Sequence, residues 1–167
     1  MNVDKYIVLV EKQEEQLQFP HFNRKDAWDL GKIFAEEILN KNYALSVSIR
    51  LLNGLILFQY SPEGTVLNNE SWMARKFNTV REMETSTLLF TLRMQRGKQT
   101  LENRVPEPKL YVTGGGGFPI RVAGTGLVGA ALVSGLPGVQ DHNVLVECIS
   151  RYLKARDVPV IPEKAKL

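Results

Sequence analysis

Nine of the thirteen glycines lie within residues 113–138, and this clustering restricts the possible folds more than any other feature of the sequence. Glycine allows positive φ angles and lets another group approach the backbone closely. Here the glycines interrupt two apolar runs, Phe118–Val122 and Leu127–Val133. The pattern predicts a β-hairpin that is entered through a glycine-rich loop and left through a turn.

The stretch Gly124–Gly129 also matches the dinucleotide-binding pattern G-x-G-x-x-G. That fingerprint requires a strand before it and a helix that opens within it, so that the helix N-terminus meets the pyrophosphate. The apolar run Leu127–Val133 favours a strand instead, and no acidic residue follows about 20 residues later in a βαβ context. We therefore interpret the match as a hairpin turn and not as a nucleotide site.

Two helices are predicted before the first strand. The first covers about Val3–Gln18 and ends before Pro20. The second begins after Asn23, a suitable N-cap with Asp26 three residues further on. Its apolar residues recur on one helical face, which indicates a helix with one side on a core. The residues on that face are Ala27, Leu30, Gly31, Phe34 and Ile38.

A change of hydrophobic period marks the first strands. Apolar and polar residues alternate over Leu45–Leu51, which predicts a half-buried strand. The polar residues of this strand are Ser46, Ser48 and Arg50. Asn53-Gly54 is the preferred pair for a two-residue type I′ turn, so Leu55–Tyr60 is predicted as the second strand of a hairpin.

The remaining elements are predicted from caps, prolines and helical periodicity. They are a helix from Asn68 or Asn69 to about Arg81, a helix over Ser86–Arg96, a short turn over Thr100–Arg104, a short strand at Tyr111-Val112, and a last helix that Asp141 caps and that runs to about Tyr152. Two hairpins favour an antiparallel sheet, whose apolar face needs helices to cover it. The sequence predicts a single α+β domain over residues 1–157 and a loose C-terminal tail over residues 158–167.

Composition excludes several classes of function. A formal net charge of +3 is more simply explained by a solvated surface than by nucleic-acid binding. The single cysteine, Cys148, excludes an internal disulfide and is typical of a reducing compartment. The N-terminus lacks the features of a signal peptide, and no apolar run approaches the roughly 18 residues of a membrane-spanning helix. We expect a cytoplasmic protein that contacts neither membrane nor nucleic acid.

Catalytic and metal-binding motifs are weak. Asp141 and His142 are adjacent, and neighbours on a helix do not face each other, so a helix cap is a simpler interpretation than a catalytic dyad. No complete set of nucleophile, base and orienting group can be assembled, and the sequence leans against an enzyme. A metal site needs several ligands, whereas His21 and His142 are far apart in sequence and Cys148 has no partner at metal-ligand spacing. A single axial ligand to haem stays open, since one side chain suffices.

Basic residues gather in the span 75–109. They are Arg75, Lys76, Arg81, Arg93, Arg96, Lys98, Arg104 and Lys109, against Glu82, Glu84, Glu102 and Glu107. A solvated face explains such a span more simply than an anion site does, although a carboxylate or phosphate could bind there. Trp72, one turn before the basic pair Arg75-Lys76, is a candidate for the rim of a ligand cleft, for a subunit contact or for the core.

Several blocks occur in a characteristic order: Gly115–Ile120, Gly126–Ala130, Val133–Pro137 and Asp141-His142. Together they resemble the GlcG/HbpS-like, or haem-degrading domain, superfamily. Two further blocks, Asp26–Gly31 and Asn69–Trp72 followed by Arg75-Lys76, are similar to those of a bacterial and fungal branch, uncharacterised protein family 0303. The resemblance covers about Leu17–Tyr152.

The resemblance implies a profilin-like fold, in which helices cover both faces of a five-stranded antiparallel sheet in α/β/α layers. It also implies a homo-oligomer, and it makes haem a candidate ligand, because relatives bind haem and promote its breakdown. One position departs from the branch pattern: Gly114 stands where a histidine commonly precedes the glycine pair, which puts any role of that imidazole in doubt here.

Eight residues are the candidates for ligand binding: Trp72, Arg75, Lys76, Gly115, Gly116, Gly117, Phe118 and His142. In this hypothesis the glycine loop lets a small ligand approach the backbone, and the basic pair binds its carboxylates. The first hypothesis for function is thus a module that binds a small anionic ligand, with haem as one candidate. The alternatives are a non-catalytic oligomeric interaction protein and an enzyme that promotes oxidative haem breakdown.

Overall fold

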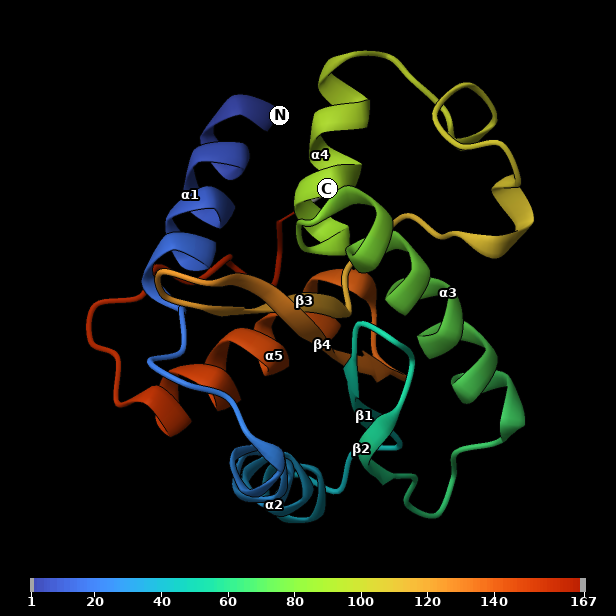
Figure 1. Ribbon diagram of the computed structural model, residues 1–167. Helices are drawn as coiled ribbons and strands as arrows, with labels where there is room; N and C mark the ends of the chain where they lie inside the picture. The colour runs from blue at the N-terminus through green and yellow to red at the C-terminus, as the bar shows by residue number, and fades with distance from the viewer. Residues whose placement is uncertain (1, 166–167) are drawn as a thin grey trace.

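A computed structural model describes residues 2–165 (Figure 1). Its sheet has four antiparallel strands in the order β2-β1-β4-β3. The strands are β1 Ser46–Leu51, β2 Ile56–Tyr60, β3 Gly117–Val122 and β4 Gly126–Ser134. The helices are α1 Val3–Gln16, α2 Arg24–Asn40, α3 Leu67–Met83, α4 Thr87–Arg96 and α5 Gly138–Leu153, with short 3-10 turns at Leu101–Asn103 and Pro108–Leu110.

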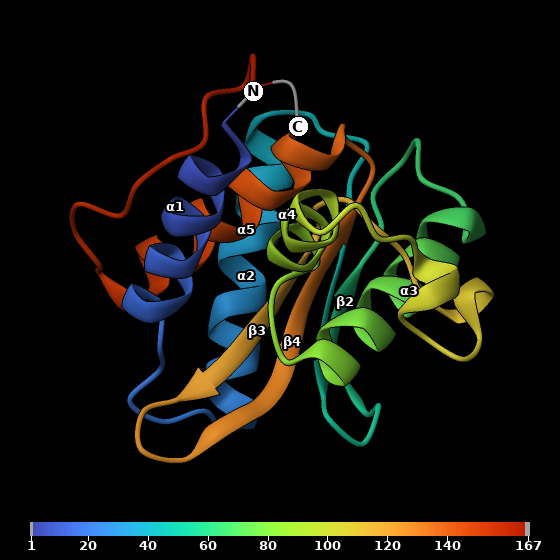
Figure 2. The ribbon, with the colours of Figure 1, turned by 90° about the horizontal axis from the view of Figure 1, so that it is seen from above.

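Helices cover both faces of the sheet, as Figure 2 shows. The alternation of strand residues divides the core, because successive side chains point to opposite faces. Val47, Ile49 and Val133 pack in the cluster with α2 and α5, which contains the buried thiol of Cys148. Ala130 and Leu132 pack instead against α3. The α+β class with helices around an antiparallel sheet is therefore confirmed.

The glycine-rich hairpin predicted from the sequence is confirmed. β3 and β4 pair antiparallel, with Phe118 opposite Ala131. The last glycine of the G-x-G-x-x-G match, Gly129, lies within β4, and a Cβ there would come within 2.3 Å of the Arg50 carbonyl oxygen on β1. That glycine serves close approach of two strands, and no helix opens within the match.

The turn between β1 and β2 differs from the predicted type. In a type I′ turn both central residues need positive φ, but in the pair Asn53-Gly54 only the glycine has it, at +93°. The Gly54 amide donates to the Leu51 carbonyl at 2.9 Å, and the Asn53 side chain accepts from the Leu55 amide at 3.0 Å. Because this side-chain hydrogen bond holds the asparagine, the hairpin uses a longer loop ending in a left-handed glycine.

The prediction of five strands is wrong, since the sheet has four. Tyr111-Val112, the expected short strand, lies in a loop. The Val112 amide donates to the Thr79 hydroxyl at 3.1 Å and its carbonyl accepts from the same hydroxyl at 3.1 Å. A side chain of α3 thus satisfies the backbone groups that a neighbouring strand would otherwise pair.

The first strand is buried more completely than its alternating pattern predicts. Its polar residues Ser46, Ser48 and Arg50 are as buried as its apolar ones, because α3 lies over them. The prediction of a half-buried strand is wrong for this reason. Periodicity indicates which face of a strand is polar, but not whether that face is exposed. Here the polar side chains are buried because they hydrogen-bond to one another and to α3.

Helix starts follow the sequence at some ends only. Asn23 caps α2 as predicted, and Asp26 completes a capping box, because each side chain accepts from the other residue's backbone amide. α3 starts two residues earlier than expected, after Val66. Asp141 does not cap α5, which already starts at Gly138, so the carboxylate is free for a partner outside the helix.

The segment after Val158, expected to be loose, packs against the body of the protein as far as Ile161. The Ile161 side chain is fully buried, and its carbonyl accepts from the Asn143 side chain at 2.9 Å. The Pro159 carbonyl accepts from the Gln13 side chain at 2.7 Å. Within residues 2–165, no helix has the length and apolar character needed to span a membrane.

Candidate functional site

A cavity of about 420 Å³ lies where α3, the glycine loop and the start of α5 converge. Its lining residues are Asn68, Asn69, Trp72, Lys76, Val112, Thr113, Gly114, Gly115, Ser134, Gly135, Leu136, Gly138 and Asp141. The volume lies within the range of about 300–1,000 Å³ that is usual for small-molecule sites. Three of the eight candidates from the sequence, Trp72, Lys76 and Gly115, are therefore part of one cavity wall.

A buried ion pair forms the floor of this cavity. The Lys76 ammonium lies 2.8 Å from the Asp141 carboxylate and 2.8 Å from the Val133 carbonyl oxygen. The other carboxylate oxygen accepts from the Leu136 amide at 2.9 Å. Burial raises the pKa of Asp141, and the neighbouring ammonium opposes that rise. An ammonium group has three N–H donors, and the described residues 2–165 provide acceptors for two of them, which leaves the third for a ligand or water.

The glycine loop is shaped around this ion pair. A Cβ on Gly116, whose φ is +114°, would come within 2.3 Å of the Lys76 ammonium nitrogen. A Cβ on Gly115 would come within 1.9 Å of the Gly138 carbonyl oxygen, at the start of α5. Glycine is thus required at both positions, because any side chain would displace either the ammonium group or the helix.

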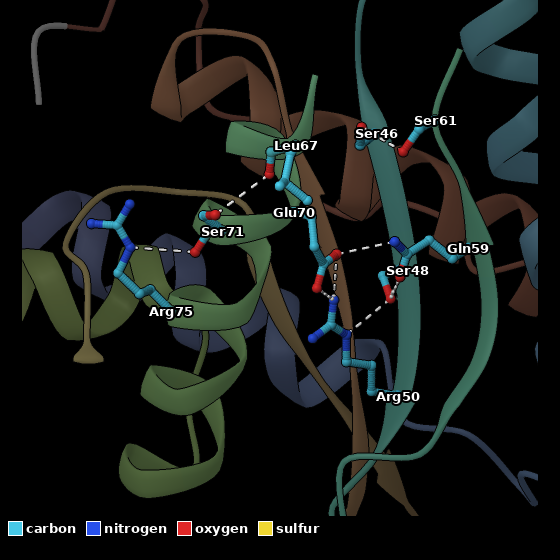
Figure 3. A network of polar contacts seen from close by, with 9 residues as sticks. All are labelled: Ser46, Ser48, Arg50, Gln59, Ser61, Leu67, Glu70, Ser71 and Arg75. Atoms are coloured by element: carbon cyan, nitrogen blue, oxygen red, sulfur yellow. Dashed lines mark hydrogen bonds and ion pairs between the residues drawn. The ribbon is translucent and has the colours of Figure 1, made fainter. Parts of the chain in front are cut away.

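Trp72 and Arg75 form a stacked pair beside the cavity. The guanidinium carbon lies 3.9 Å from the centre of the indole ring, and Trp72 remains 37% exposed. The Arg75 Nε donates to the Ser71 carbonyl at 3.3 Å (Figure 3). Arg75 does not line the cavity itself. The stack holds its guanidinium cation against Trp72, which does line the cavity.

The other candidate residues lie behind the cavity. Gly117 and Phe118 are buried in β3, and the Gly117 amide donates to the Thr87 hydroxyl at 3.0 Å. His142 is fully buried, with its Nε2 2.8 Å from the Gln13 side-chain oxygen and its ring 5.9 Å from that of Phe118. Burial lowers the pKa of His142 to about 3, so the imidazole is neutral. Gly117 and the side chains of Phe118 and His142 lie behind the walls and do not line the space.

The candidates from the sequence leave out five polar lining residues, and Asp141 and Asn69 among them make contacts across the site. Asp141 was interpreted as a helix cap, although its partner is the ammonium of Lys76, 65 residues earlier in the chain. Asn69 holds the start of α3 to β4: its side-chain oxygen accepts from the Val66 amide at 2.9 Å, and its nitrogen donates to the Ser134 carbonyl at 3.1 Å. The resemblance of the block Asn69–Trp72 to the family pointed to this turn. It did not indicate that the Asn69 side chain contacts β4.

A polar network lies beside the cavity, under α3 (Figure 3). One guanidinium nitrogen of Arg50 donates to both carboxylate oxygens of Glu70, at 2.7 and 2.8 Å. The Arg50 Nε donates to the Ser48 hydroxyl at 3.0 Å, and Gln59 donates to the same carboxylate at 3.0 Å. The network joins β1 and β2 to the first turns of α3, and so fixes the helix that carries Trp72 and Lys76.

Metal and haem ligands are scarce around the cavity. Within residues 2–165, no group of three or more His, Cys, Asp or Glu side chains could hold a metal ion. The lining contains no His, Cys, Met or Tyr, which are the usual protein ligands of haem iron. His21 is exposed, but it pairs with Asp26 at 2.8 Å and does not line this cavity. The residues present therefore fit a small anion and do not fit haem iron.

Comparison with known proteins adds a family to this geometry. Residues 22–150 match the family described as "Haem degrading protein HbpS-like". A UPF0303 protein of Serratia proteamaculans is 35% identical over 154 residues, which are 92% of this chain and 95% of the relative.

Two solved structures are similar in fold. The Ybr137w protein has a TM-score of 0.81 at 24% identity and covers 87% of both chains. A structure described as a PduOC:heme complex has a TM-score of 0.63 at 20% identity, over 84% of this chain and 99% of that one.

Proposed function

The chain belongs to the UPF0303 proteins within the HbpS-like family, and from that premise we propose that its cavity between α3 and α5 binds a small anionic ligand. The observation that carries the proposal is the buried ammonium of Lys76 in the cavity lining, for whose three N–H donors residues 2–165 provide two acceptors. An anion there would pair with a group that is already desolvated, where electrostatic attraction is strong.

Backbone groups add to this attraction. The start of α5 at Gly138 lies on the cavity wall, and the first amides of a helix have no partner within the helix. The helix dipole favours negative charge at this end. Gly114 and Gly115, which lie directly against the start of α5, add no side chains to this part of the wall, so a carboxylate or phosphate can approach the backbone directly.

The ligand we propose carries no iron. A relative whose structure is described as a heme complex makes haem a natural candidate, as does the family description. The cavity lining offers cationic and amide groups for carboxylates, but it lacks an axial ligand for the metal. A compact organic acid or phosphate can pair with the Lys76 ammonium and with backbone amides of this space, whereas haem would leave its iron without a protein ligand there.

Ligand titration of the purified protein tests the proposal. Thermal-shift and calorimetric titrations with acetate, succinate, inorganic phosphate and hemin are compared for the wild type and Asn68→Asp. Asn68 is an exposed lining residue, so the added carboxylate keeps the shape and repels an anion. At an effective dielectric near 20 such a charge is worth of the order of 1 kcal/mol, so we expect the variant to bind about three- to tenfold more weakly.

Gln18→Glu is the matched control, because Gln18 is exposed and lies outside the cavity. It adds the same charge and should bind as the wild type does. The proposal is overturned if none of the small anions binds, or if both variants lose affinity equally. A hemin titration with a Soret shift that Asn68→Asp leaves unchanged would place haem outside this cavity.

A further inference from the structure

The two edges of the sheet are treated differently. At the β3 edge, the Phe19 amide donates to the Arg121 carbonyl at 2.7 Å, and the Phe19 carbonyl accepts from the Ala123 amide at 2.8 Å. This isolated bridge, between Phe19 and Val122, covers the C-terminal end of that edge. β2 is the other edge strand, and the structure of residues 2–165 pairs it with β1 alone.

Apart from an irregularity in its pairing at Leu57, β2 lacks the features that usually protect an edge strand. Proteins place charges, prolines or a covering segment there, because unpaired backbone groups attract another strand. No charged residue occurs between Arg50 and Glu63, and Ile56–Tyr60 contains neither proline nor glycine. Ile56 is 44% exposed. A strand of this composition in solution is a pairing surface.

Helix α2 extends this apolar surface beyond the strand. Trp28 is 56% exposed, and its ring lies 6.0 Å from that of Phe58 on β2, edge to face. Gly31 allows this close packing, since a Cβ there would come within 2.3 Å of the Phe58 ring. The helix therefore lies against the edge strand, and Figure 1 shows the two elements as neighbours. The exposed Trp28 ring lies next to the strand.

An apolar hollow lies on the same side of the molecule. It has a volume of about 570 Å³ and is lined by Phe22, Asn23, Arg24, Lys25, Leu51 and Leu57. Leu57 belongs to β2, and Lys25 is one turn before Trp28 on α2. A projecting aromatic ring and an apolar hollow side by side are the two halves of a self-complementary contact, which a two-fold axis can bring together.

The charges around Trp28 also suit a second copy. Lys25 and Lys32 lie one turn before and after Trp28, with Asp29 between them. Asp29 accepts from Lys25 at 2.7 Å and lies 3.3 Å from Lys32. This row alternates in sign, so an antiparallel copy displaced by one turn places opposite charges together. A surface meant for a strongly acidic or basic partner would carry one sign.

We propose that β2 and the exposed face of α2 form the contact between two copies of this chain. The two β2 strands pair antiparallel about a two-fold axis, which joins the sheets into one of twice the width. On one face of that sheet the two α2 helices meet, and each Trp28 enters the apolar hollow of the partner. The contact is independent of the ligand cavity, which lies between α3 and α5.

Charge substitution at the edge tests this contact. Light scattering at about 10–100 µM should give the wild type a mass that is an even multiple of 18.8 kDa. Ile56→Lys adds a charge to the exposed edge and should weaken the two-fold contact about tenfold or more, which halves the mass on dilution. Val8→Lys is the control: Val8 is 64% exposed on α1, and this variant should keep the wild-type mass.

Three results would overturn the proposal. They are a monomeric wild type at 100 µM, an odd multiple of the chain mass, or Ile56→Lys with the wild-type mass and a native circular dichroism spectrum. If the natural partner of β2 is a strand from a different protein, the purified wild type would be monomeric. If Ile56→Lys does not fold, Trp28→Ala replaces it, because an exposed side chain is truncated; an unchanged dissociation constant in that variant contradicts the contact.

Discussion

At the scale of single residues, His142 is neutral because it is fully buried. Its Nε2 faces the Gln13 side-chain oxygen, because the Gln13 nitrogen donates to the Pro159 carbonyl. Nε2 therefore carries the ring proton, and Nδ1 is buried without a hydrogen-bond partner. Burial lowers the pKa of this imidazole from 6.5 to about 3. The residue stabilises the contact between α1, α5 and the C-terminal segment only while it is uncharged.

This burial makes stability depend on pH. Below pH 6.5 the unfolded chain takes up a proton that folded His142 refuses until about pH 3, so the free energy of unfolding falls as the pH falls. One such proton contributes about 1.4 kcal/mol per pH unit. We expect His142→Gln to lose this part of the slope in urea unfolding between pH 6.5 and 5. A variant whose stability falls as steeply as that of the wild type would contradict this assignment.

The sequence identified some residues of the site but not others, and the reason is physical. The resemblance named Trp72, Lys76 and Gly115, which lie in recurring blocks, and the structure places all three in one wall. Asp141 could not be assigned to Lys76 from the sequence, because their ion pair forms only when α3 and α5 meet across the sheet. Local sequence patterns indicate composition and helix caps, but they do not indicate which residue distant in sequence will be the partner in a tertiary contact.

At the scale of elements, the C-terminal segment is a part of the core. Ile161 packs with Ile7 and Val10 of α1 and with Leu89 of α4. α1 and α4 pack on each other in this cluster, so the segment helps to hold them together. Its prolines and charges were typical of a loose tail, and a single apolar residue outweighs them because its burial removes apolar surface from water.

Truncation of one side chain tests that role. Ile161→Ala should lower the free energy of unfolding by about 2–5 kcal/mol, because it leaves a cavity in a closely packed cluster. Val160→Ala is the matched control, since Val160 is 66% exposed and an exposed truncation costs within about 0.5 kcal/mol. Urea unfolding of both variants gives the comparison. Equal stability of the two would mean that the segment is not held in solution.

Elements defined by local chemistry were predictable, and those defined by distant partners were not. Asn23 and Asp26 cap α2 within one turn, and the glycine hairpin is set by its own loop. Tyr111-Val112 has the composition of a strand, yet Thr79 of α3 takes its hydrogen bonds. The number of strands therefore depended on a contact between residues 33 positions apart. Hydrophobic periodicity, which is a local pattern, cannot predict such a contact.

At the scale of the whole molecule, one thiol reports on the central packing. Cys148 lies fully buried between α5 and the sheet, and burial raises its pKa to about 12. A thiol in this state does not react, since the thiolate is the nucleophile. Exposure of Cys148 requires α5 to leave the sheet, which would break the main core that α2 and α5 share.

Labelling of this thiol tests whether the chain unfolds as one unit. We expect the free energy of opening, measured by alkylation of Cys148 at low urea, to equal the free energy of unfolding from circular dichroism. Single domains of this size usually unfold in one cooperative step, and α5 contributes to the shared core. Labelling with a clearly smaller free energy of opening would show that α5 separates before the rest.

The strand-like contact of Phe19 has a consequence for how far such a protein can assemble. A sheet with two open margins can add neighbours without end, which is the route to fibres. Here the chain's own N-terminal segment occupies one margin. Growth through the other margin stops after a single partner, so the same feature that closes one side of the fold keeps association through β2 finite.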